Sequence, residues 1–140
     1  MFIIGHRGAC RFLPENTLES FRLAFESTDM IEFDVHTSKD LVPVVIHDAT
    51  LERTTDGNGF VNRKSHKELS LLDAGFNFDP DKNRSFPYRG KGMRILSLEE
   101  MFTHFPDKKL LIEIKENSPE LTHAVMALVK TAEELCAKAV

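Results

Sequence analysis

Four short apolar segments of this sequence carry, or run directly into, charged and other ionisable side chains. The segments are 2–5, 30–35, 44–46 and 110–114. Their ionisable residues are His6, Arg7, Glu32, Asp34, His47, Asp48, Glu113 and Lys115. Each segment has the length and apolar character of a buried strand, and an unpaired charge is expensive to remove from water. Strands that carry charge near the same end therefore predict one shared polar site.

Strands and helices alternate along much of the chain. Apolar residues at helical spacing follow three predicted N-terminal caps, at Asn16, Ser97 and Ser118. Asn16 and Ser97 each have a glutamate three residues later, and Ser118 precedes a proline at the first helical position. This order predicts an α/β fold with a parallel sheet covered by helices. The last helix is expected to continue to Val140 without a C-terminal cap, as if it were cut.

Residues 52–95 are predicted to be mostly irregular: they include the turn-rich segment 55–59, a short helix expected within 66–72, and aromatic residues at 76–88 that follow no clear period. Irregular stretches of this length in a compact domain are usually functional or mobile. We interpret this one as an insertion near the site that shapes substrate access, within one domain over residues 1–140. A disordered surface excursion is an equally good interpretation of the same residues.

The composition argues against two classes of partner. A net charge of −4 gives no reason to expect nucleic acid, and no apolar run is long enough to span a membrane. The first strand is predicted to begin at Phe2, so we expect no signal peptide, and two cysteines give no disulfide framework. A reducing cytoplasm is therefore the expected location.

The carboxylates predict a site for a hard cation. Glu32 and Asp34 lie two residues apart on one strand, so their side chains point to the same face, and Glu113 and Lys115 repeat this pattern. Carboxylates that face one another repel, and they need protonation, cationic partners or a bound cation. Three carboxylates without cysteine suit Mg²⁺, Ca²⁺ or Mn²⁺. A buried network neutralised by Lys115 and Arg7 is an equally good interpretation.

The histidines and the cations add the groups that phosphate chemistry needs. His6 and His47 each end a strand, and histidine exchanges protons near neutral pH. Arg7 offers a planar fork of donors that suits phosphate, and a divalent ion with an arginine and a lysine would stabilise negative charge on a phosphoryl group. The combination predicts cleavage of a phosphate ester.

Six short motifs, in this order and spacing, resemble those of the glycerophosphodiester phosphodiesterases. The motifs are His6-Arg7-Gly8, Pro14-Glu15-Asn16-Thr17, Glu32-x-Asp34-Val35, Pro43-Val44-Val45-Ile46-His47-Asp48, Arg53-Thr54-Thr55 and Glu113-x-Lys115. The resemblance implies a (β/α)₈ TIM barrel with its site at the C-terminal ends of the strands. It implies hydrolysis of glycerophosphodiesters to glycerol 3-phosphate and an alcohol, with Mg²⁺ or Ca²⁺ as cofactor. By the same resemblance the metal ligands are Glu32, Asp34 and Glu113, the acid and base are His6 and His47, and the phosphate contacts are Arg7 and Lys115. Leu41 departs from the pattern, since the family commonly has glycine there.

The length of the chain departs further from this family. A (β/α)₈ barrel needs about 250 residues, whereas 140 residues supply about the first four β/α units. We therefore expect part of a longer barrel, with open sheet edges through which copies could associate. Two alternatives remain: an inactive half barrel that serves as an assembly module, and a relative of lysophospholipase D that acts on longer lipids.

Overall fold

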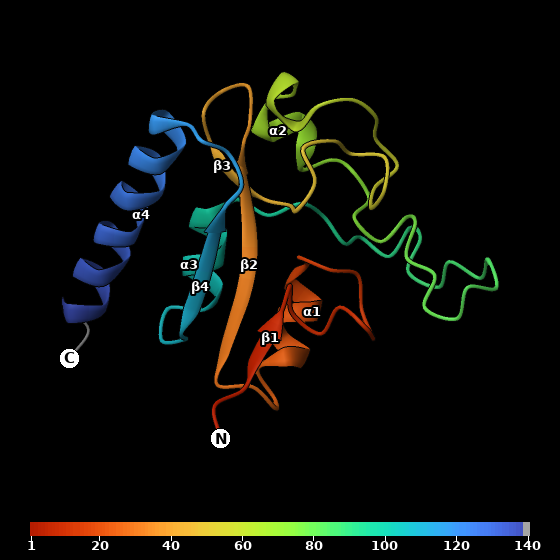
Figure 1. Cartoon of the computed structure of the whole chain (residues 1–140), viewed down its shortest axis with the longest axis horizontal. Helices are drawn as coiled ribbons and strands as arrows, with labels where there is room; N and C mark the ends of the chain where they lie inside the picture. The colour runs from red at the N-terminus through yellow and green to blue at the C-terminus, as the bar shows by residue number, and fades with distance from the viewer. Residues whose placement is uncertain (139–140) are drawn as a thin grey trace.

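The computed structural model describes residues 1–138, so the predicted helix end at Val140 lies outside the described residues. The strands are β1 (Ile4–His6), β2 (Met30–Thr37), β3 (Pro43–Val45) and β4 (Leu110–Ile114). The helices are α1 (Leu18–Ala24), α2 (His66–Leu69), α3 (Leu98–His104), α4 (Pro119–Lys138) and the short 3₁₀ helix η1 (Val61–Arg63). Figure 1 shows β2 at the centre of this arrangement.

The sheet is built around β2, and its strands are not all parallel. β1 and β4 pair with β2 in parallel, but β3 pairs with it antiparallel. The backbone N–H groups of Arg7 and Ile46 donate to the carbonyls of Glu32 and Asp34, which point to one edge of β2. β1 and β3 therefore share this edge, and β4 occupies the other.

The prediction that residues 44–46 form a strand of a parallel sheet is wrong. Only residues 38–42 connect β2 to β3, and a parallel crossover needs a dozen residues or more. Leu41 lies in this turn with a φ of 61°, in the left-handed region that favours glycine. Three of the described strands are thus parallel, and the predicted count of four β/α units is not confirmed.

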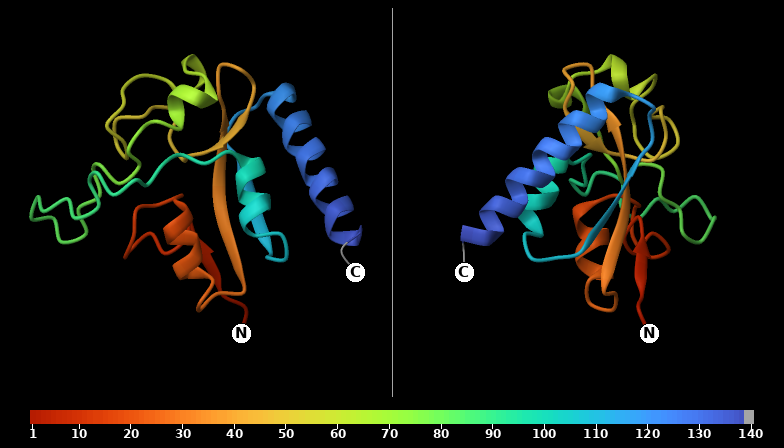
Figure 2. Two further views of the ribbon diagram at one scale, coloured as in Figure 1. Left: turned by 180° about the vertical axis from the view of Figure 1, so that it is seen from behind. Right: turned by 60° about the vertical axis from the view of Figure 1, so that its left-hand side comes forward.

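One face of the sheet is covered by α1, α3 and α4 (Figure 2). Ile31, Phe33 and Val35 of β2 are fully buried on this face, as the alternation along the strand predicts. Phe21 of α1 packs against Phe33, with ring centroids 5.8 Å apart. The residues that alternate with this apolar set, Glu32 and Asp34 among them, therefore face away from the helices.

Two of the three predicted helix caps are correct. The Ser97 hydroxyl accepts from the N–H of Glu100, and the Glu100 carboxylate accepts from the N–H of Ser97. The Ser118 hydroxyl accepts from the N–H of Leu121. The cap of α1 is Thr17 and not Asn16. Asn16 has a φ of 58° and its side-chain amide donates to Asp34, so it is directed into the polar face of the sheet.

The irregular segment is anchored to the rest of the fold by a second apolar cluster. Val61, Leu69 and Ile95 are buried in it together with Leu51 and with Val44 of β3. The interpretation of residues 52–95 as an insertion that shapes access stays a prediction. None of the helices within residues 1–138 combines the length and the apolar character needed to cross a membrane.

Candidate active site

Three carboxylates meet on the open face of the sheet. Glu32 and Asp34 come from β2, and Glu113 comes from β4 with its Cα in register with that of Asp34. Each of the three offers an oxygen, and these oxygens lie within 4.8 Å of one another. Because β2 and β4 run in parallel, the alternation along each strand brings all three side chains to the same place. The predicted grouping of these carboxylates is therefore present.

The surroundings of Glu32 fit a bound cation. Glu32 is 8% exposed, and its Oε1 has no hydrogen-bond partner among the described residues. Burial, with the charge of Asp34 as the next cause, raises the pKa of Glu32. A buried carboxylate oxygen without a partner is unfavourable, and an all-oxygen donor set is what Mg²⁺ and Ca²⁺ prefer. These three residues thus fit a divalent cation.

Arg7 and Lys115 neutralise part of this charge. Arg7 Nε lies 3.2 Å from Asp34 Oδ2, and Lys115 Nζ lies 3.3 Å from Asp34 Oδ1 and 2.8 Å from Glu113 Oε1. The bond from Lys115 to Glu113, helped by Asp34, raises the pKa of Lys115 against the effect of burial. Because three carboxylates are paired with only two cationic side chains, one negative charge of the cluster is not balanced. The ion pairs and the carboxylates that fit a cation therefore belong to one cluster.

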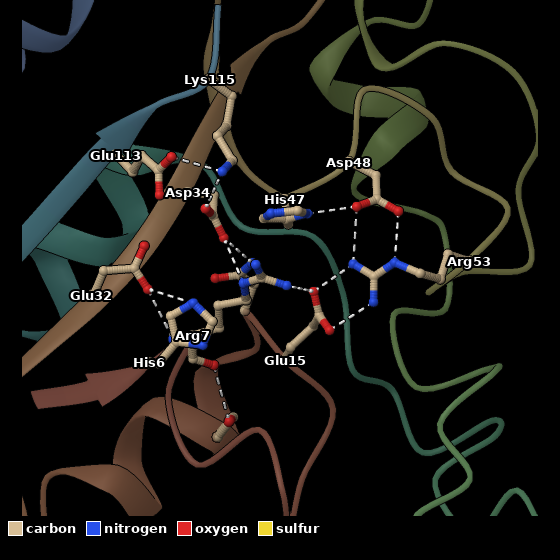
Figure 3. Close-up of polar contacts among 12 residues, drawn as sticks. His6, Arg7, Glu15, Glu32, Asp34, His47, Asp48, Arg53, Glu113 and Lys115 are labelled. Atoms are coloured by element: carbon tan, nitrogen blue, oxygen red, sulfur yellow. Dashed lines mark hydrogen bonds and ion pairs between the residues drawn. The ribbon is translucent and has the colours of Figure 1, made fainter.

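His6 lies at the edge of the carboxylate group. It ends β1, in register with Glu32 of β2, and its Nε2 lies 3.7 Å from Glu32 Oε2. Its side chain is 62% exposed, so the imidazole is open to a ligand as well as to the carboxylates. Figure 3 shows His6 beside Glu32 and Arg7.

His47 is held in place by its neighbour in sequence. His47 Nδ1 lies 2.6 Å from Asp48 Oδ1. Hydrogen bonds from Arg53, and a further one from His47, lower the pKa of Asp48 to about 2 despite partial burial. An ionised carboxylate only accepts hydrogen bonds, so Nδ1 of His47 donates to Asp48. In the neutral tautomer that makes this bond, the lone pair is on Nε2.

Behind His47, the ring of His36 supports the backbone. His36 is 5% exposed and its Nε2 donates to the carbonyl of His47 at 2.9 Å, while Nδ1 lies 2.8 Å from Glu116 Oε1. Glu116 also accepts from the N–H of Thr37. The end of β2, the segment after β3 and the segment after β4 are thereby tied together.

Sequence reasoning did not assign a role to Arg53. Its guanidinium bridges Asp48 and Glu15, and Glu15 in turn accepts from Arg7 (Figure 3). Glu15 is largely buried, which raises its pKa, but the pairing with Arg53 and Arg7 outweighs this and lowers it. Glu15 and Asn16 both lie at the edge of the site, where Glu15 accepts from Arg7 and the Asn16 amide donates to Asp34. The only sequence signal for Arg53 was its place in one of the motifs.

A surface pocket adjoins this ion-pair cluster. It is lined by residues from three parts of the chain, namely Pro14, Glu15, Arg53, Thr54, Ala74, Asn77, Phe78 and Asp79. Part of the irregular segment therefore stands beside the polar site. The arrangement as a whole brings three carboxylates that fit a cation, two imidazoles and two cationic side chains to one face. Groups of these types suit phosphate-ester chemistry.

Known proteins resemble this chain in sequence and in structure. The chain is 41% identical over 117 residues to a glycerophosphodiester phosphodiesterase of Caldanaerobacter subterraneus, covering 83% of this chain and 45% of that protein. It is 39% identical over 128 residues to the lysophospholipase D GDPD1 of Mus musculus, covering 91% of this chain and 40% of that one. The chain thus spans less than half the length of these relatives.

A solved structure shows the same fold. The phosphodiesterase of Oleispira antarctica, in complex with the product sn-glycerol-3-phosphate, superposes with a TM-score of 0.78 at 32% identity, covering 93% of this chain and 52% of that one. The sequence model of the glycerophosphoryl diester phosphodiesterase family matches residues 6–136. The chain belongs to the glycerophosphoryl diester phosphodiesterase family.

Proposed function

We propose that this chain carries the catalytic groups of an enzyme that hydrolyses glycerophosphodiesters to glycerol 3-phosphate and an alcohol. The observation that carries the proposal is the meeting of Glu32, Asp34 and Glu113 within 4.8 Å on the face that also holds His6 and His47. Family membership and the product in the Oleispira antarctica structure support it. Because the relatives are about twice as long, the activity is proposed for the complete protein.

Glu32, Asp34 and Glu113 would hold one divalent ion, Mg²⁺ or Ca²⁺. Such an ion supplies a positive charge that stabilises developing negative charge on the phosphoryl oxygens. Arg7 and Lys115, which already lie on this cluster, contact the phosphate and compensate its charge.

The two histidines move the protons. His47 Nε2 takes the proton from the attacking hydroxyl of the glycerol moiety, whose oxygen bonds to phosphorus as the bond to the alcohol oxygen breaks. His6 gives its proton to that alcohol oxygen. Water then opens the cyclic phosphate, with His6 taking the proton of the water and His47 returning one to the glycerol oxygen. The Nδ1 bond to Asp48 suits His47 to the first step, since it presents Nε2 unprotonated.

The test is release of glycerol 3-phosphate from glycerophosphocholine and glycerophosphoethanolamine, with and without a chelator. It is run on this chain and on a longer protein that contains it. Turnover that the chelator stops, and that Mg²⁺ or Ca²⁺ restores, is expected. His47→Ala and Glu32→Ala should each abolish it, and an active longer protein that tolerates both changes would contradict the assigned roles.

The lysophospholipase-D-like alternative is favoured by the similarity to the mouse enzyme. It predicts open apolar surface in the 76–88 segment. There, however, the Arg89 guanidinium stacks on Phe76 and Phe86, 3.9 and 4.1 Å from their centroids, and Phe78 packs on Tyr88. These aromatics are half-buried against their neighbours. We therefore expect short glycerophosphodiesters to be cleaved faster than lysophospholipids when the two are compared directly.

The remaining alternative is an assembly module. Within residues 1–138, β1 and β4 each pair with β2 alone, so each leaves one backbone edge unpaired. This predicts association that rises with concentration, measured by sedimentation, without turnover at any metal concentration. The cytoplasmic location stays a prediction.

A further inference from the structure

Arg53 lies between two carboxylates that come from different parts of the chain. Its Nε and Nη2 donate to Asp48 at 2.6 and 3.1 Å, and its Nη1 and Nη2 donate to Glu15 at 2.8 and 2.7 Å. Asp48 is five residues away in sequence, whereas Glu15 is 38 residues away. Both contacts are two-pronged, which fixes the plane of the guanidinium as well as its distance.

Each of these carboxylates touches a group of the proposed active site. Asp48 Oδ1 accepts from His47 Nδ1 at 2.6 Å and Glu15 Oε1 accepts from Arg7 Nη1 at 3.2 Å. Figure 3 shows the resulting series of contacts running from His47 through Arg53 to Arg7. The Arg53 side chain thereby joins the segment after β3 to the segment after β1. Among the described residues, β1 and β3 each pair with β2 and not with each other.

We propose that Arg53 is a positioning residue, which orients the Asp48 carboxylate so that His47 presents an unprotonated Nε2 to the substrate. The inference rests on the proposed function for its catalytic consequence, but the orientation of His47 is a property of the chain itself. Arg53 acts through Asp48 and does not touch His47.

The chemistry requires arginine at this position. Three nitrogens in one plane serve two carboxylates at once, and an ammonium group offers its donors from a single atom and reaches only one of them in this way. If the bonds from Arg53 are lost, the Asp48 side chain is free to rotate about its terminal torsion, and Oδ1 is no longer held toward Nδ1. The neutral imidazole then divides between its two tautomers.

The primary test is nitrogen-15 NMR of the His47 ring in this chain, because imidazole nitrogen shifts distinguish the tautomers without any turnover. Arg53→Lys and Arg53→Gln are compared with the unchanged chain, and His47→Gln assigns the signal. We expect one tautomer, with the proton on Nδ1, in the unchanged chain and a mixture of tautomers in both variants. Both variants retaining the single tautomer would overturn the proposal.

Arg94→Lys is the matched control. Arg94 has similar exposure and pairs with Glu100 at 2.6 Å near the start of α3, outside the site. Its replacement should leave the His47 signal unchanged, and a mixture of tautomers in this variant too would show that the effect is not specific to Arg53. Circular dichroism establishes that each variant is folded. When Arg53→Gln does not fold, the tautomer seen in the milder Arg53→Lys tests the proposal by itself.

Kinetics supplies a second readout in the active protein. Arg53→Lys should lower kcat by about 10- to 100-fold and change KM by less than about threefold, as for other residues that orient a catalytic group. A change in KM alone would mean that Arg53 binds substrate instead, which also contradicts the proposal. Absence of turnover in the unchanged protein would overturn the proposed function, while the NMR result would still decide the role of Arg53.

Discussion

Asp34 and Glu113 stand opposite each other on neighbouring parallel strands, with their Cα atoms in register. Like charges in such a cross-strand pair destabilise a sheet. Asp34 is fully buried, so water does not screen it, and Lys115 is placed within 3.3 Å of it. Such a pair of carboxylates is expected at a site where a bound metal ion balances the negative charge that Lys115 leaves.

Adding Mg²⁺ or Ca²⁺ should raise the melting temperature of the chain. Binding to the folded state alone stabilises by about 2.7 kcal/mol when the ion is present at about 100 times Kd, which corresponds to about 5 to 10 °C for a domain of this size. Asp34→Asn should remove most of this shift. Glu120→Gln, a change in the exposed first turn of α4, should retain it. An equal shift in both variants would place the bound ion elsewhere.

Acid should weaken the fold partly through Asp48. Its pKa is about 2 in the folded chain and 3.8 is its ordinary value, because Arg53 and His47 donate to it. The folded state therefore binds this proton more weakly, so the stability that Asp48 contributes is present above about pH 4 and is lost as the pH falls toward 2. Urea unfolding of the chain and of Asp48→Asn should show a stability difference at pH 6 that narrows toward pH 2. A constant difference would contradict this.

Gly8 is placed where a side chain cannot fit. Its φ is 82°, and a Cβ would lie 2.5 Å from Ser20 Oγ and 2.9 Å from the Ser20 backbone carbon. Gly8→Ala should therefore lower the free energy of unfolding by more than the roughly 1 kcal/mol expected for left-handed strain alone. Gly59→Ala is the control, because Gly59 has a φ of 84° with nothing within 4 Å of its Cβ position. If urea unfolding shows the same loss of stability for Gly8→Ala and Gly59→Ala, Ser20 moves aside at no cost and the prediction is wrong.

Leu41 carries backbone strain that glycine would relieve. It has a φ of 61° in the turn between β2 and β3 and is 60% exposed, so little packing is lost when its side chain is removed. Leu41→Gly should raise the free energy of unfolding by about 0.5 to 1 kcal/mol. This gain is the left-handed backbone strain that glycine removes, minus the extra conformational entropy that glycine gives the unfolded chain. Leu41→Ala keeps the Cβ and should give no gain. A similar gain from both changes would point to the exposed side chain, and not to the backbone.

The site could be predicted from sequence as far as it depends on the spacing of residues within one strand. Glu32 and Asp34 share a face, and Phe33 is buried on the other, because side chains alternate along any strand. The caps at Ser97 and Ser118 were predictable for the same reason, since their bonds reach only three residues along the chain.

The tertiary structure decided everything that depends on residues far apart in sequence. The direction of β3, the turning of Asn16 toward Asp34 in place of capping α1, and the bridge from Arg53 to Glu15 are contacts of this kind. Periodicity says which face a side chain takes but not which distant segment will lie beside it. That choice is made by packing and by the pairing of buried charges, which only the folded arrangement brings together.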